Sequence, residues 1–353
     1  MTIDLNDRGV VRELDPKGIL ELTERFPDQC RQAWAAAREM KPKPQEVRPG
    51  VVALAGMGGS AAGGDFVRAL FEANGSAPFL VIRDYHVPNY VGVGDLVFCA
   101  SYSGETEETL NAYEEARRAG ARIVAVTSGG ELKRRAEAHG YDVYSVPGGQ
   151  PPRTALGFML IPVIAACEAF GLLRPQPHEN AYALLDDCAK EWGVDAADNP
   201  AKVLARDMHG ALPILYGLGA WQTAIANRWR CQINENAKHL ALVSGYPELN
   251  HNEIMGWVGA SSQGVGRFVG VVLEDGRESD RMKTRARVTE VLLKDVVRFH
   301  HVCARGESLL ERLLSLAYFG DWTSLYLARL NGVDPEDIGN IDRLKAELAK
   351  IAS

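Results

Sequence analysis

Apolar residues along the chain fall into two recurring patterns. From Val51 onward, short continuous apolar runs alternate with longer stretches in which apolar residues recur every three or four positions. Short continuous runs are typical of strands buried in a parallel sheet, and the longer spacing is typical of helices. The alternation indicates an α/β fold with right-handed crossovers and helices on both faces of the sheet. The pattern predicts strands at 51–55, 79–83, 95–100, 122–127 and 142–146, and helices at about 60–73, 105–119 and 131–139.

A Gly-x-Gly pair follows an apolar run at two places in the chain. The pairs are Gly56 with Gly58 and Gly217 with Gly219, and a helical pattern follows each of them. They lie a domain's length apart, which indicates two copies of one α/β unit rather than short repeats. The chain is therefore expected to comprise an N-terminal helical extension at 1–48, a first domain at 49–153, connecting helices at 154–200, and a second domain with C-terminal helices at 201–353.

The N-terminal extension has the pattern of two helices. A helical stripe is formed by Ile19, Leu20, Leu22 and Phe26. A second helix is predicted at about 28–40, with Asp28 as its N-cap after Pro27. The run 41–44, which contains two prolines, is expected to end this helix and to link it to the first domain.

A glycine-rich turn joins the first predicted strand to its helix and contains Gly58, Gly59 and Ser60. Glycine lets the backbone approach a ligand closely, and a helix N-terminus presents free N–H groups and a positive dipole end. The turn therefore predicts a bound phosphate or another anion, although a tight turn without a ligand has the same residues. It also fits a dinucleotide fingerprint, because Asp84 follows near the ~20-residue spacing of a ribose-binding acid.

Hydroxyl side chains cluster where the third predicted strand ends, at Ser101, Ser103 and Thr106. The carboxyl ends of parallel strands meet at one edge of a sheet, so these hydroxyls are expected to lie beside the glycine turn. Hydroxyl groups and backbone amides can bind phosphate with few charged residues, although serine and threonine also serve as ordinary helix caps. Glu105 lies within the cluster and has to point away from a bound phosphate.

The second copy lacks the hydroxyl cluster but has polar motifs of its own. Glu235 lies between two asparagines just after a predicted helix, and His251 lies between two more. A carboxylate and a histidine can move protons near neutral pH, whereas helix caps and solvated acids are the alternative interpretation. Arg153, where the chain leaves the first domain, is either a surface residue or the positive charge that the hydroxyl cluster lacks. The spacing of His251 and Glu253 does not indicate a metal site.

Composition and charge narrow the class of protein. The 353 residues carry a formal net charge of −7, which does not favour nucleic acid as a partner. The six cysteines are scattered without a CxxC pair, as expected in a reducing cytoplasm. Neither a signal peptide nor an apolar run of membrane-spanning length is recognisable, so we expect a cytoplasmic location and no membrane contact.

Motifs from both copies follow one another along the chain as Gly58-Gly59-Ser60, Ser101-Tyr102-Ser103-Gly104-x-Thr106, Asn234-Glu235-Asn236-x-Lys238, Glu248-Leu249-Asn250-His251-Asn252-Glu253 and Gly332-Val333-Asp334-Pro335. In this order they resemble the bifunctional phosphoglucose/phosphomannose isomerase family, whose members contain two sugar isomerase (SIS) domains. The resemblance runs from about residue 50 to the C-terminus. The first two motifs are shared by SIS domains in general, whereas the third and fourth are typical of this family.

The resemblance implies two tandem SIS-type domains, each a mostly parallel sheet flanked by helices. It implies that the sugar phosphate is held by Gly58, Gly59, Ser60, Ser101, Ser103 and Thr106. It also implies residues that act on the sugar, namely Arg153 to steady the enediolate, Glu235 as the base between C2 and C1, His251 for ring opening, and Lys345 at the ring and its hydroxyls. In the family the histidine comes from the partner subunit of a homodimer, and the expected reaction uses neither a cofactor nor a metal.

The expected activity is the reversible isomerisation of glucose 6-phosphate and fructose 6-phosphate, and also of mannose 6-phosphate, through a cis-enediol intermediate. One alternative is an isomerase for another sugar phosphate, such as an amino sugar or a heptose. A second alternative is a non-catalytic sugar-phosphate sensor. A sensor would keep the hydroxyl cluster but would not need Glu235 together with His251.

Overall fold

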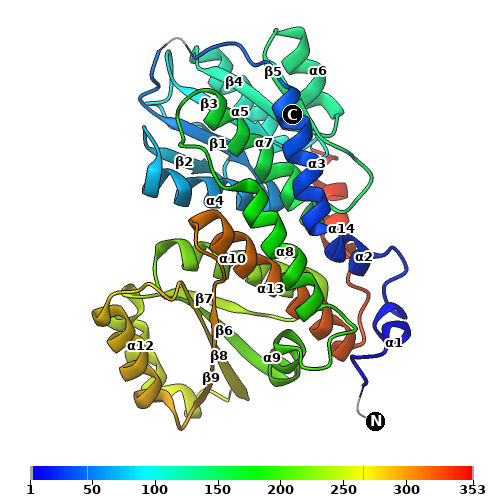
Figure 1. Cartoon of the computed structure of the whole chain (residues 1–353), viewed down its shortest axis with the longest axis vertical. Coiled ribbons are helices and arrows are strands. Elements are labelled where there is room, and N and C mark those ends of the chain that lie inside the picture. Colours follow the sequence, from blue (N-terminus) through cyan, green and yellow to red (C-terminus); the bar gives the residue numbers. More distant parts are fainter. Residues whose placement is uncertain (1–2, 46, 265, 352–353) are drawn as a thin grey trace.

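The computed structural model describes residues 3–45, 47–264 and 266–351. It contains two parallel β-sheets, each packed against helices, with further helices between them (Figure 1). In the view of Figure 1 the first sheet lies in the upper half of the molecule and the second in the lower half. The predicted α/β fold class is therefore confirmed.

The first sheet has five parallel strands in the order β2-β1-β3-β4-β5. Helices cover both faces, so β1 and β3 are buried along their whole length, which explains their continuous apolar runs. Because β2 lies on one side of β1 and β3 on the other, the strand order reverses between β1 and β3, where α/β sheets bind ligands. The elements are β1 (Val52–Gly56), α4 (Gly58–Asn74), β2 (Phe79–Ile82), β3 (Leu96–Ala100), α5 (Glu107–Arg118), β4 (Arg122–Thr127), α6 (Gly130–Ala138) and β5 (Asp142–Ser145).

The second sheet has four parallel strands in the order β7-β6-β8-β9, which repeats the order of the first four strands of the other sheet. The predicted internal repeat is thus present in the strand order. Short helical turns, rather than one long helix, connect β7 to β8. The elements are β6 (Ala211–Gly217), α10 (Ala220–Ala237), β7 (Leu242–Gly245), η2 (Glu248–His251), α11 (Glu253–Gly256), η3 (Trp257–Ser262), β8 (Arg267–Glu274), α12 (Asp280–Leu293) and β9 (Val297–Cys303).

A single apolar core joins the two sheets. Its buried side chains run from Leu54 and Phe98 in the first sheet to Leu215 and Val271 in the second. Helix α13 lies between the sheets and is buried over almost its whole length, so its sequence is apolar on nearly all sides (Figure 1). The helices of this layer are α7 (Leu156–Ala169), α8 (His178–Trp192), α9 (Pro200–Met208) and α13 (Leu309–Asn331).

The N-terminal extension packs against the layer between the sheets. Its helices are α1 (Arg8–Arg12), α2 (Ile19–Glu24) and α3 (Phe26–Glu39), and α3 lies against α7 and α8. The prediction that Asp28 caps the second helix is wrong, because the helix begins at Phe26 and Arg25 takes the N-cap position. Pro27 sits within the first turn, where its fixed φ and its missing N–H are both tolerated.

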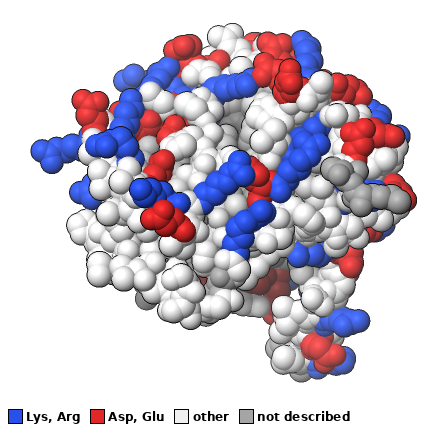
Figure 2. Space-filling view, turned by 90° about the horizontal axis from the view of Figure 1, so that it is seen from below, with Lys and Arg blue, Asp and Glu red and all other residues white. Residues whose placement is uncertain are grey.

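The surface of the molecule is mixed in character. On the face seen in Figure 2, basic and acidic side chains are interspersed. Helix α14 (Gly339–Leu348) follows α13 and has no buried residue, and its apolar side chains Ile341, Leu344 and Leu348 are exposed along one face. None of the helices in the described residues is long and apolar enough to cross a membrane.

Candidate active site

The glycine turn after β1 lies against backbone on two sides. Helix α4 begins at Gly58, which has a φ of 50°. A Cβ on Gly56 would lie only 2.8 Å from the carbonyl oxygen of Ala100, and a Cβ on Gly59 would lie 3.0 Å from that of Pro152. Larger side chains would push these segments apart. The turn is therefore fixed between the end of β3 and the segment that carries Arg153.

The hydroxyl loop after β3 lies beside this turn because β1 and β3 are paired. Ser60 and Ser101 are both buried, and the Ser101 hydroxyl lies 2.8 Å from the Thr106 hydroxyl. Ser101 Oγ also accepts a hydrogen bond from the Gly104 N–H at 3.1 Å. The predicted hydroxyls thus gather at one sheet edge, beside the first turns of α4 and α5, whose N–H groups lack helical partners.

Glu105 points away from the hydroxyl loop. Its Oε1 accepts a hydrogen bond from the N–H of Glu131 at 2.9 Å, in the first turn of α6. Gly104, with a φ of 75°, allows this approach, since a Cβ there would lie 1.9 Å from the carbonyl oxygen of Gly129. Ser103 Oγ is also engaged and accepts from the Glu105 N–H at 3.2 Å. A carboxylate at a helix N-terminus is favourable, so Glu105 is held at the start of α6 rather than at the hydroxyl loop.

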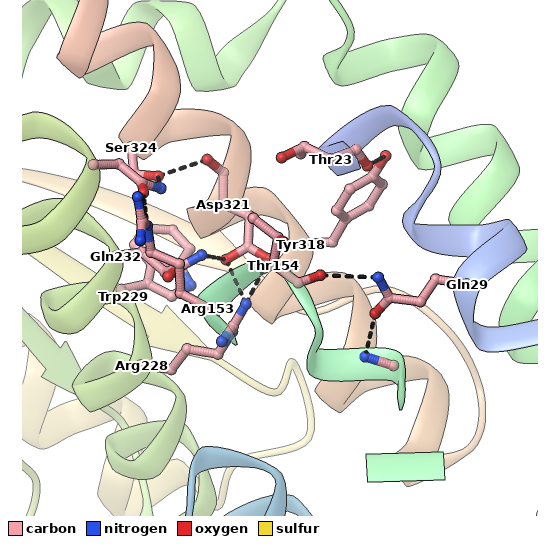
Figure 3. A network of polar contacts seen from close by, with 12 residues as sticks. Thr23, Gln29, Arg153, Thr154, Arg228, Trp229, Gln232, Tyr318, Asp321 and Ser324 are labelled. Carbon is pink, nitrogen blue, oxygen red and sulfur yellow. Dashed lines mark hydrogen bonds and ion pairs between the residues drawn. The ribbon is translucent and has the colours of Figure 1, made fainter. Parts of the chain in front are cut away.

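Arg153 is buried between the two domains, in the short helix η1 (Pro152–Thr154) (Figure 3). Its Nε donates to Asn236 Oδ1 at 2.8 Å, and its Nη2 donates to the carbonyl oxygen of Pro335 at 2.6 Å. Its Nη1 lies 3.8 Å from Glu235 Oε2. Burial lowers the pKa of Arg153 and the Glu235 carboxylate opposes this, so the guanidinium keeps its charge at neutral pH. Arg153 is therefore a buried residue of the site and not a surface cation.

Glu235 belongs to a helix that is longer than predicted. The prediction that it follows the helix is wrong, because α10 continues to Ala237 and places Glu235 in its last turn, about one-third exposed. Lys238 ends the helix with a φ of 48°, and its Nζ donates to the carbonyl oxygens of Glu235 and Asp334 at 2.7 and 2.6 Å. These bonds satisfy a carbonyl group of the last turn of α10. They also join the motif at 234–238 to the motif at 332–335.

His251 and Lys345 are not brought to Arg153 within the single chain. His251 is exposed at the end of η2, and Lys345 is exposed in α14. Among the described residues, neither forms a hydrogen bond or ion pair with Arg153 or Glu235. Asn252 accepts from the N–H that follows it and caps α11, so this asparagine of the motif has a local role.

A large cavity lies on the second domain rather than beside Arg153. Its volume is about 920 Å³, and it is lined mainly by apolar side chains of β6, β7 and residues 253–263. Met255 and Val258, in the same segment, are 70% and 79% exposed. This apolar groove therefore adjoins the connection between β7 and β8 that carries His251, Met255 and Val258.

The site can also be compared with what a metal ion or a dinucleotide would need. Among the described residues, no group of three or more His, Cys, Asp or Glu side chains is placed to hold a metal ion. Asp84, the acid of the dinucleotide fingerprint, is exposed and accepts from the N–H of Tyr85 at 2.6 Å. The side chains at the sheet edge are hydroxyls and an arginine, which suit a phosphate ester and a developing negative charge.

Two buried polar residues near Arg153 belong to no motif of the sequence analysis. Gln29 of α3 hydrogen-bonds the backbone next to Arg153, and Ser324 of α13 hydrogen-bonds Asn236. The signal that could have revealed them is a polar residue on an otherwise apolar helix face, because buried polar groups need partners. Such a pattern predicts that the polar side chain is buried and hydrogen-bonded, but it does not identify the partner residue.

The comparisons with known proteins agree with this geometry. A model of the SIS domain matches residues 48–145, and a model of the bacterial phospho-glucose isomerase C-terminal SIS domain matches residues 197–348. The molecule is therefore a protein of two SIS domains. The chain is 38% identical over 338 residues to a bifunctional phosphoglucose/phosphomannose isomerase of Caldicellulosiruptor bescii, covering 94% of this chain and 99% of that protein. The chain belongs to the bifunctional phosphoglucose/phosphomannose isomerase family.

Further relatives extend this result. A bifunctional phosphoglucose/phosphomannose isomerase of Aquifex aeolicus is 36% identical over 304 residues, covering 85% of this chain and 91% of that protein. The crystal structure of a glucose-6-phosphate isomerase-like protein from Thermus thermophilus has a similar fold, with a TM-score of 0.62. It is 22% identical and covers 98% of this chain and 99% of that chain. The expected fold of two tandem SIS-type domains is confirmed.

Proposed function

We propose that this protein catalyses the reversible isomerisation of glucose 6-phosphate and fructose 6-phosphate, and of mannose 6-phosphate and fructose 6-phosphate, with Glu235 as the base. One observation carries the proposal. Gly59 packs against the backbone of Pro152, and the next residue, Arg153, extends Nη1 to 3.8 Å from Glu235 Oε2. The proposed anion site and the Glu235 carboxylate thus lie on either side of one buried arginine.

The phosphate of the substrate is proposed to bind where α4 and α5 begin. Helix N-termini attract anions, and hydroxyl groups can donate to phosphate oxygens. The phosphate takes no part in the reaction, so its binding energy serves to position the reacting end of the sugar. The proposed phosphate-binding residues are Gly58, Gly59, Ser60, Ser101, Ser103 and Thr106.

The proton transfer is proposed to take place between Arg153 and Glu235. The Glu235 carboxylate removes the proton from C2 of the open-chain aldose, the C–H electron pair forms the C1–C2 double bond, and the negative charge moves to O1. The Arg153 guanidinium stabilises this enediolate. The proton on O2 then passes to O1. Glu235 delivers the proton that it took from C2 to C1, which gives the ketose. Return to the other face of C2, after rotation about the C2–C3 bond, gives the epimeric aldose. No electron leaves the sugar in this scheme.

Ring opening is proposed to use His251 of the partner subunit in a homodimer, with Lys345 assisting at the ring. An imidazole can accept and deliver the ring proton near neutral pH. His251 is exposed in the single chain, and it lies in the same connection between β7 and β8 as the exposed Met255 and Val258 beside the apolar groove. Exposed apolar surface of this kind is common at interfaces between subunits, and it supports the proposal.

The test is turnover of fructose 6-phosphate in the presence of EDTA, with formation of glucose 6-phosphate and mannose 6-phosphate followed by NMR. The Glu235→Gln variant is expected to lose about 10²–10⁴-fold in kcat while it still binds substrate. Glu179→Gln, in an exposed turn of α8, is the matched control and should keep its activity. No turnover to either aldose by the wild-type protein, or full activity of Glu235→Gln, would contradict the proposal.

A further inference from the structure

We propose that Gln29 and Asn236 are positioning residues of Arg153, one acting through its backbone and the other through its guanidinium. The inference rests on the proposed role of Arg153 in stabilising the enediolate. It also gives a role to the N-terminal extension, which the proposed reaction leaves unused. Both side chains are buried, Gln29 with 5% and Asn236 with 2% of its surface exposed.

Gln29 holds the backbone on the C-terminal side of Arg153. Its Nε2 donates to the carbonyl oxygen of Thr154 at 2.9 Å, and its Oε1 accepts from the Gly157 N–H at 2.7 Å (Figure 3). Gly157 lies in the first turn of α7, where N–H groups lack helical partners and the N-cap side chain makes no bond. A Cβ on Gly157 would lie 2.9 Å from the same oxygen, so glycine permits the contact. Gln29 therefore ties the segment that carries Arg153, and the first turn of α7, to helix α3.

Asn236 fixes the guanidinium in one orientation. Its Oδ1 accepts from Arg153 Nε at 2.8 Å, and its Nδ2 donates to Ser324 Oγ at 2.9 Å. The Ser324 hydroxyl donates to the carbonyl oxygen of Asp321 at 2.7 Å. Because the only proton of that hydroxyl is used on Asp321, Ser324 must accept from the Asn236 amide. The amide can therefore present only its oxygen to Arg153.

The bonds to Arg153 determine which edge of the guanidinium faces the reaction. Nε is paired with Asn236 and Nη2 with the carbonyl oxygen of Pro335, whereas Nη1 faces Glu235. The Nη1 donors are thus directed toward the place where charge develops on the sugar. Donors that are held in position before the reaction stabilise a transition state without reorganising during it. A free arginine side chain would have to be ordered in each turnover, at a cost in conformational entropy.

A buried polar row continues from Asn236 along α10. Arg228, Gln232 and Asn236 recur every four residues and so share one face of the helix. Arg228 Nη2 donates to both carboxylate oxygens of Asp321 of α13 at 3.0 and 2.8 Å, and Gln232 Nε2 donates to Asp321 Oδ1 at 2.9 Å (Figure 3). This row fixes α10 against α13, and it therefore also sets the position of Glu235 in the last turn of α10.

A double-mutant cycle tests the proposal. Gln29→Leu and Asn236→Leu are each expected to lower kcat for fructose 6-phosphate by about 10-fold or more, with KM changed by less than about 3-fold. The reason is that the Arg153 Nη1 donors, which act on the transition state, are no longer held in position. In an Arg153→Lys background the same changes should lower kcat by less than about 2-fold, since residues that act through one group are not additive. An equal loss in both backgrounds, or wild-type kcat in folded single variants, would overturn the proposal.

Matched controls separate positioning from general loss of packing. Gln222→Leu and Asn199→Leu remove a buried glutamine and a buried asparagine that are not bonded to Arg153 or its neighbours. Their kcat should stay within about 2-fold of wild type at temperatures where they are folded. An inactive wild-type protein would contradict the proposed function, whereas an active wild type with unaffected Gln29 and Asn236 variants would contradict only the positioning.

A conservative variant gives a second readout if a leucine variant does not fold. In Gln29→Glu, the protonated carboxyl can donate to the Thr154 carbonyl and accept from the Gly157 N–H, as the amide does. The ionised carboxylate cannot donate, and it faces the Thr154 oxygen. The ratio of its kcat to that of wild type is therefore expected to rise at least about 5-fold between pH 8 and pH 5.5, because burial raises the pKa of a carboxyl group. A ratio that does not change with pH would overturn the proposal.

Discussion

Replacing Arg153 by lysine tests how much of the rate depends on a guanidinium held at this position. The guanidinium reaches Asn236 Oδ1, the Pro335 carbonyl and the neighbourhood of Glu235 through three different nitrogens. A lysine keeps the charge but has one nitrogen on a flexible stem, so it cannot occupy all three positions. Loss of one oriented donor to a developing oxyanion costs about 2.7–4 kcal/mol, which corresponds to about 10²–10³ in kcat.

Arg153→Lys is therefore expected to lower kcat by about 10²–10³ with little change in KM, because the hydroxyl loop that holds the phosphate is intact. The variant also leaves a buried carbonyl or amide oxygen without its donor, which costs about 1–3 kcal/mol of stability. A coupled assay of glucose 6-phosphate formation and denaturant unfolding measure the two effects. A kcat within about 3-fold of wild type, or a loss confined to KM, would refute the reasoning.

Three further predictions follow from the same structure. Ser101→Ala should raise KM about tenfold with kcat nearly unchanged in steady-state kinetics, since a hydroxyl to the phosphate is lost. Asp321→Asn should lower the free energy of unfolding by about 3–5 kcal/mol in urea titrations, because it leaves the buried Arg228 charge without its carboxylate. His301 bonds to Glu274 and a second carboxylate, which raise its pKa to about 9. Its charged form stabilises the fold fully below pH 6.5, and this contribution is lost as the pH rises through about 9. Because the side chain is partly exposed, the contribution is only about 1 kcal/mol, so urea unfolding of wild type and His301→Gln should differ by that amount at pH 6 and converge by pH 10.

The five strands of the first sheet were predictable from the sequence to within one or two residues, whereas β7 of the second sheet was not predicted. The runs that form β1 and β3 are continuous and apolar because both faces of the sheet are covered, and few other structures require that pattern. Helix ends were less predictable. The end of α10 depends on the pairing of Asn236 with α13 and on the contact of Lys238 with Asp334, and neither is a local property of the sequence.

Some features of the candidate site could likewise be predicted from the sequence, and others could not. The gathering of Ser60, Ser101 and Thr106 follows from strand order alone, since adjacent parallel strands end at one edge. The burial of Arg153 could not be read from its neighbours, because the residues that surround it come from α10 and from the loop after α13. Gln29 was missed for the same reason, since its partners lie in a segment far along the chain. The direction of Glu105 also required the position of α6.

The central claim is that Glu235 moves a proton between C2 and C1 of the sugar, and solvent exchange tests it most directly. Fructose 6-phosphate is incubated with enzyme in D₂O, and NMR follows the entry of deuterium at C1. The wild-type protein is expected to incorporate deuterium, and Glu235→Gln is expected to do so at least about 10²-fold more slowly while it still binds the substrate. Exchange by Glu235→Gln at the wild-type rate would contradict the account.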